Sequence, residues 1–95
     1  MNETNKDFAP PQPDFKFFVT TLALQAAIFL GEIANPETKT KETNLPQAKF
    51  IIDTLDMLKE KTKNNLSKDE TDTLEGVLYE LRTQYLAKNR EGGKS

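Results

Sequence analysis

The stretch FKFFVTTLALQAAIFLGEI, residues 15–33, decides how this chain folds. On a helical wheel at about 100° per residue it is apolar on nearly every side, and Thr21, Gln25 and Glu32 form a narrow polar ridge. Its main apolar face comprises Phe15, Phe18, Val19, Leu22, Ala26, Phe29, Leu30 and Ile33. Such a helix belongs in a protein interior or in a membrane. The stretch therefore predicts one central helix over residues 15–33.

The same stretch does not favour a membrane span. A span needs about 20 predominantly apolar residues, and Thr20, Thr21 and Gln25 interrupt the run between Lys16 and Glu32. A secretory leader begins with basic residues, whereas the first fourteen residues carry three acidic side chains and one lysine. We therefore expect a cytoplasmic protein without a membrane span.

Composition narrows the possible functions. The 95 residues suffice for one small domain, and the formal net charge is −2. The 13 basic residues are spread along the chain, which argues against nucleic acid as a partner. Cysteine and histidine are absent, so a disulfide framework, a His or Cys zinc site and a histidine base are all excluded.

Two further helices are predicted over residues 45–63 and 68–88. Asn44 is a good N-cap, and Ser67 with Glu70 fits a capping box. Asn64 interrupts the pattern between these helices, because asparagine tolerates the left-handed conformation that closes a helix. Residues 1–13 are proline-rich and polar, so we expect a disordered arm there, a single helical domain over residues 14–88, and a disordered tail over residues 89–95.

The acidic side chains are the best candidates for a catalytic or metal-binding site. Asp53 and Asp56 lie one turn apart on the second helix, and a second acidic group opens the third helix. The aspartates lie among lysines and opposite the apolar residues, so the pattern favours a solvated surface over metal or acid–base chemistry. We predict no catalytic, cofactor-binding or metal-binding residue, and hence no enzyme.

The first helix is too apolar to be covered by its own chain. Two neighbouring helices leave about a third of its circumference open, and Phe17, Leu24 and Ile28 form the face opposite the main one. Ala23, Ala27 and Gly31 form a stripe of small residues that lets two helices approach closely. We predict a homodimer or a higher symmetric helical bundle with these six residues at the interface, and Glu32 meets either water or a lysine of a neighbouring chain.

Gly76 is a second unusual position, in the middle of the third helix. Glycine there costs about 1 kcal/mol relative to alanine. Either sequence drift or the close passage of another helix accounts for it.

Three segments together, LALQAAIFLGEI, AKFIIDTLDMLKEKTKNNLSKDE and LYELRTQY, resemble the bacterial family known as domain of unknown function 1844. The resemblance covers about Phe15 to Leu86 and is most specific at KTKNNL, residues 61–66. Asn64 departs from the family, whose members often carry glycine there. The resemblance implies a small cytoplasmic helical protein and transfers no functional residues.

These observations favour a non-enzymatic, self-associating structural or adaptor module, with an unidentified second protein as a further possible partner. The alternative is a carrier or sensor that holds an apolar ligand among Phe17, Phe18, Phe29 and Phe50.

Overall fold

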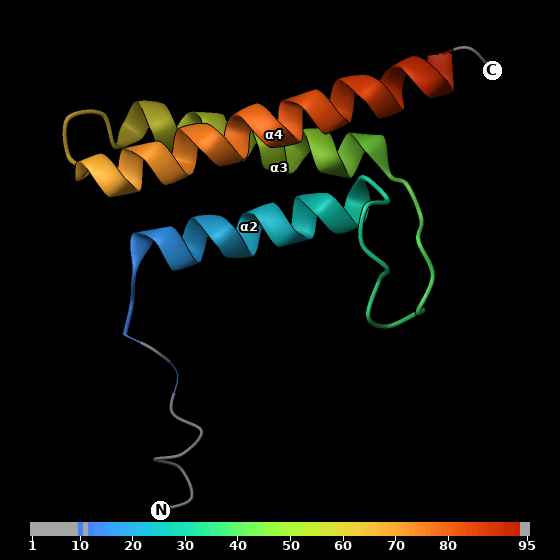
Figure 1. The fold of residues 1–95 in the computed structure, drawn as a ribbon, viewed down its shortest axis with the longest axis horizontal. Helices are drawn as coiled ribbons and strands as arrows, with labels where there is room; N and C mark the ends of the chain where they lie inside the picture. Colours follow the sequence, from blue (N-terminus) through green and yellow to red (C-terminus); the bar gives the residue numbers. More distant parts are fainter. Residues whose placement is uncertain (1–9, 11, 94–95) are drawn as a thin grey trace, which may run out of the picture.

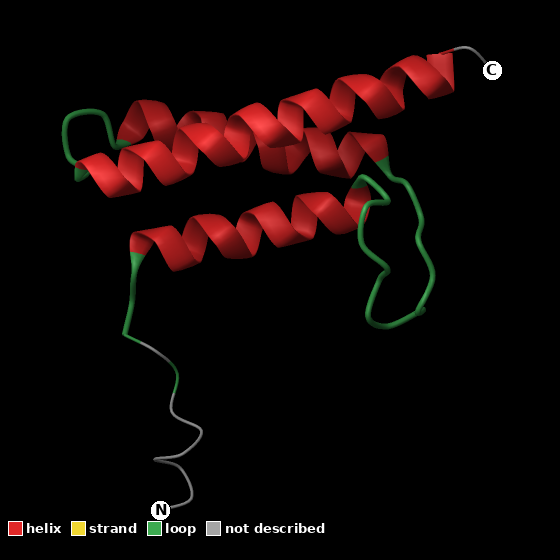
Figure 2. Ribbon diagram, in the orientation of Figure 1, coloured by secondary structure: helices red, strands yellow, loops and turns green. Residues whose placement is uncertain are grey.

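Three helices form the part of the chain that the computed structural model describes, namely residue 10 and residues 12–93. They are α2 (Phe15–Phe29), α3 (Leu45–Lys61) and α4 (Lys68–Gly93). α2 and α4 run in the same direction and α3 runs opposite to both (Figure 1), and the described residues form only helices and loops (Figure 2). The predicted all-α fold of three helices is confirmed. The predictions for residues 1–9, 11 and 94–95 lie outside the described residues.

Each helix begins where its capping residue predicts. The Asp14 carboxylate accepts a hydrogen bond from the Phe17 amide at 2.9 Å, and the Asn44 side chain accepts one from the Gln47 amide at 3.2 Å. At the start of α4 the Glu70 amide donates to Ser67 Oγ and the Ser67 amide donates to Glu70 Oε1. These bonds satisfy amide groups that a helix N-terminus otherwise leaves without partners.

The helix ends differ from the prediction. α2 ends at Phe29 rather than at residue 33, because Gly31 adopts a φ of +79°. The Gly31 amide then donates to Ile28 O at 3.0 Å and the Glu32 amide to Ala27 O at 2.9 Å, which is the bonding pattern of a Schellman motif. α3 ends at Lys61, two residues early, and Asn64 has a φ of 70° as expected of the turn. α4 continues to Gly93, since no glycine or proline follows Lys88 until Gly92.

Backbone hydrogen bonds join the two ends of the loop between α2 and α3. An isolated β-bridge joins Leu30 to Thr43, and the Asn44 amide donates to Phe29 O at 2.7 Å. Farther out, the Asn35 amide donates to Thr40 O at 2.9 Å. The two ends of this long connection therefore lie side by side.

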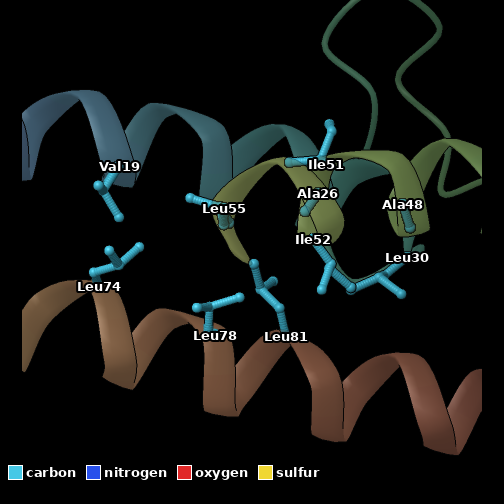
Figure 3. Close-up of a cluster of buried hydrophobic side chains, with 10 residues drawn as sticks. All are labelled: Val19, Ala26, Leu30, Ala48, Ile51, Ile52, Leu55, Leu74, Leu78 and Leu81. Atoms are coloured by element: carbon cyan, nitrogen blue, oxygen red, sulfur yellow. The ribbon is translucent and has the colours of Figure 1, made fainter. Parts of the chain in front are cut away.

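The core lies between all three helices, and each helix packs against the other two. Val19 of α2 and Leu74 of α4 point toward one another, and Leu55 of α3 lies between these two helices (Figure 3). The buried apolar residues are Val19, Ala26, Leu30, Ala48, Ile51, Ile52, Leu55, Leu74, Leu78 and Leu81. The core is small, as expected for a chain of this length.

Two members of the predicted main face of the first helix are exposed. Phe18 is 48% exposed and Ile33 is 40% exposed. The buried side of α2 is centred on Val19, Ala26 and Leu30, and Phe18 is rotated about 100° from Val19. Ile33 follows the end of α2 and therefore leaves the helical repeat.

Candidate interaction surface

The outer face of α2 carries large apolar side chains that neither α3 nor α4 covers. Phe17 is 58% exposed and Leu24 is 50% exposed, and both lie opposite the buried Val19 and Ala26. Residues 17–31 contain no charged side chain. A solvent-facing helix surface normally carries charged or polar residues, so this one has the character of a contact surface.

Phe17, Thr21, Leu24 and Ile28 form a continuous ridge, here called the α2 strip. Their spacing of four, three and four residues is that of the contact positions in a helix pair. The Thr21 hydroxyl donates to the Phe17 carbonyl at 2.9 Å, so its hydrogen-bonding capacity is used within the helix. The strip therefore exposes mainly apolar surface along the whole of α2.

A groove runs beside the α2 strip, between α2 and α4. Its volume is about 360 Å³, and its walls are mostly apolar. It is lined by Thr20, Ala23, Leu24, Ala27, Glu32 and Ile33 on one side and by Val77, Glu80, Leu81 and Gln84 on the other. Gln84 Oε1 is buried and has no hydrogen-bond partner among the described residues.

The structure divides the six predicted interface residues into three groups. Ala23, Leu24 and Ala27 line the α2–α4 groove. Phe17 and Ile28 lie on the α2 strip, with Ile28 half-buried. Gly31 lies beyond the end of the helix and closes it, so it does not extend the small-residue stripe.

The contribution of α4 to this surface was not predicted. Val77, Glu80 and Gln84 line the groove, whereas all six predicted interface residues lie in the segment of the first helix. These residues line the groove because α2 and α4 run parallel. The periodicity of the sequence does not indicate this, so it gave no signal for them.

The other two helices each expose a similar apolar pair seven residues apart. Phe50 and Met57 of α3 are 67% and 46% exposed, and Tyr79 and Leu86 of α4 are 75% and 58% exposed. In each helix a threonine lies four residues after the aromatic residue and donates its hydroxyl to that residue's carbonyl, at 2.8 Å in α3 and 2.9 Å in α4. The α2 strip differs from these pairs in the absence of charge, because residues 17–28 contain no charged side chain, whereas residues 50–57 and 79–86 each contain two.

The candidate carboxylates form ion pairs on the surface. Asp53 accepts a hydrogen bond from Lys49 Nζ at 2.7 Å, and Asp56 Oδ1 lies 2.7 Å from Arg82 Nη2, joining α3 to α4. The hydrogen bond to Asp53, reinforced by its charge, raises the pKa of Lys49 above its ordinary value of 10.5. Asp72 raises the pKa of Lys68 in the same way. No group of three or more potential ligands occurs among the described residues.

The four phenylalanines of the alternative prediction do not surround a common cavity. Phe17, Phe18 and Phe50 are exposed, and only Phe29 packs against the core. Gly76, the other unusual residue, is also exposed, and a Cβ added there would meet nothing within 4 Å. Within the described chain no second helix approaches Gly76.

Comparison with known proteins gives one match. The family model described as Domain of unknown function (DUF1844) matches residues 12–87, which include all of α2 and α3 and most of α4. No curated protein and no solved structure matches the chain. Among the helices in the described residues, none has both the length and the apolar character required to cross a membrane.

Proposed function

We propose that this chain, which belongs to the DUF1844 family, is a non-enzymatic structural or adaptor module that associates with itself through the outer face of α2. The observation that carries the proposal is the exposure of Phe17 and Leu24 on a helix face without charge. The α2–α4 groove beside them supplies further apolar surface to be covered. Because the sequence resembles a bacterial family of small cytoplasmic proteins, the proposal includes a cytoplasmic location.

Covering the exposed area favours association, and this gain is offset in part by the translational and rotational freedom that two chains lose on binding. Complete burial of a phenylalanine or leucine side chain contributes about 1.5–3 kcal/mol, and about half of each side chain is exposed in the single chain. Covering Phe17 and Leu24 in both copies of a dimer therefore contributes about 3–6 kcal/mol. That corresponds to a change of about 100-fold to 20,000-fold in the dissociation constant.

Solution mass tests this proposal. Size-exclusion chromatography with light scattering, over protein concentrations from micromolar upward, should give the mass of a dimer. A variant with Phe17→Glu and Leu24→Glu should be a monomer under the same conditions. The matched control carries Phe50→Glu and Met57→Glu, which place the same charges on an exposed apolar pair of α3, and it should remain a dimer.

Two results would overturn the proposal. One is a wild-type chain that stays monomeric at the highest concentration, with the helical circular dichroism of a folded protein. The other is dissociation of the α3 variant while the α2 variant keeps its mass.

Carriage of an apolar small molecule is the second candidate. It is favoured by the α2–α4 groove, whose volume of about 360 Å³ falls within the range of ligand sites. Native mass spectrometry separates the two candidates. A dimer without a bound small molecule favours self-association, whereas a monomer that carries a lipid favours carriage.

A further inference from the structure

The ends of the charge-free face of α2 carry opposite charges. Lys16 precedes this face and Glu32 follows it, and residues 17–31 between them contain no charge. Lys16 is half-buried and Glu32 is exposed, and neither has an ion-pair partner among residues 12–93. Within that range, each charge is therefore free to pair with a group brought to this face of α2.

Both charges lie on the side of α2 that faces the groove. Lys16, Thr20, Ala23 and Ala27 follow one another at spacings of four, three and four residues, which places them on one side of the helix. Thr20, Ala23 and Ala27 line the α2–α4 groove, and Glu32 lines its other end. A helix lying in this groove would thus meet a cation at one end, small residues in the middle and an anion at the other end.

From this arrangement we infer that the occupant of the groove is α2 of a second copy, packed antiparallel about a two-fold axis at Leu24. The inference rests on the proposed self-association and adds its geometry. Lys16 precedes Leu24 by eight residues, and Glu32, although it lies beyond the end of α2, lines the groove at its opposite end. An antiparallel copy centred near Leu24 therefore brings Lys16 of each chain toward Glu32 of the other. The contact is self-complementary, as a two-fold interface requires.

Three physical effects favour this direction over a parallel one. A parallel pair would place Lys16 opposite Lys16 and Glu32 opposite Glu32, and like charges repel. In the antiparallel pair Lys16 also lies near the negative C-terminal end of the other α2, and Glu32 near its positive N-terminal end. Finally, Ala23 and Ala27 at the centre allow the two helices to approach closely.

Site-specific cross-linking tests the direction, because the chain has no natural cysteine. Leu24→Cys lies on the axis and should form a disulfide between two identical chains under mild oxidation. Thr20→Cys should not link to itself, since the two positions are about 12 Å apart along the helix axes, but should link to Ile28→Cys in a mixed sample. Disulfide formation between two Thr20→Cys chains would indicate a parallel pair and overturn the inference.

Charge exchange supplies an independent test. Glu32→Lys should weaken dimerisation by about 2-fold to 30-fold, because two surface ion pairs are lost per dimer. Adding Lys16→Glu to Glu32→Lys should tighten the dimer relative to Glu32→Lys alone, because each pair again joins opposite charges, whereas an additive further loss would contradict the pairing. A monomeric wild-type chain would refute the proposed self-association. A stable dimer that lacks these cross-links and this rescue would refute only the antiparallel geometry.

Discussion

Replacing Gly31 with alanine should destabilise the chain through two separable effects. Gly31 has a φ of +79°, and a residue with a side chain in this left-handed region costs about 1–2 kcal/mol. The added Cβ would also lie 2.7 Å from Thr43 Oγ1, a distance that forces one of the two groups to shift. The reduced freedom of the unfolded chain offsets about 0.4–1 kcal/mol of this cost. The backbone cost less this offset leaves up to about 1.6 kcal/mol, and the contact with Thr43 Oγ1 adds to it, so we expect a net loss of about 1–2 kcal/mol.

Thermal and urea unfolding at a fixed protein concentration measure this loss. For a domain of this size, about 1 kcal/mol corresponds to about 4–8 °C in Tm, so Gly31→Ala should lower Tm by about 4–16 °C. Fixed concentration is needed because self-association would itself raise the apparent stability.

Thr43→Ala separates the two effects in a double-mutant cycle. It removes Oγ1 and keeps the backbone of the Leu30–Thr43 bridge. In this background Gly31→Ala should still destabilise, by the backbone contribution alone. The reasoning is refuted if Gly31→Ala is as stable as wild type, or if Thr43→Ala abolishes its whole effect.

Four further changes test other parts of the structure. Gly76→Ala should stabilise by up to about 1 kcal/mol in urea unfolding, since the added Cβ meets nothing within 4 Å, and a loss would contradict its exposure on α4. Ser67→Ala removes the hydrogen bond that Ser67 Oγ accepts from the Glu70 amide and should cost about 1 kcal/mol in urea unfolding. Leu55→Ala, at a fully buried position, should cost about 2–5 kcal/mol, and less than 1 would disprove its place in the core. Asp53→Asn should return the pKa of Lys49 toward 10.5 in an NMR titration. Because the folded pKa is raised, the stability from this pair is complete below pH 10.5 and is lost as the pH rises through the raised value.

Helix starts were predictable because a cap is a local interaction. Asp14, Asn44 and Ser67 each bond an amide three residues away, so the sequence alone contains both partners. Helix ends were less predictable. Gly31 could continue a helix or close it, and the closed end is accompanied by a bridge between Leu30 and Thr43, which are distant in sequence.

Only the α2 side of the candidate surface could be predicted from the sequence. Exposure of Phe17 and Leu24 followed from the wheel, since two neighbouring helices cannot enclose an apolar third helix. That Val77 and Gln84 line the groove was not predictable, because it follows from the parallel directions of α2 and α4. That course is a property of the assembled bundle.

The joined ends of the α2–α3 loop make its outer part a natural site for inserted sequence. The Leu30–Thr43 bridge and the hydrogen bond from the Asn44 amide to Phe29 O hold the first and last residues of the loop together. Residues 36–39 lie in the middle of the loop, away from these bonds. Extra residues placed between Glu37 and Thr38 would lengthen only the exposed tip. An epitope or a fluorescent-label peptide grafted there would report on the protein while its helices keep their positions.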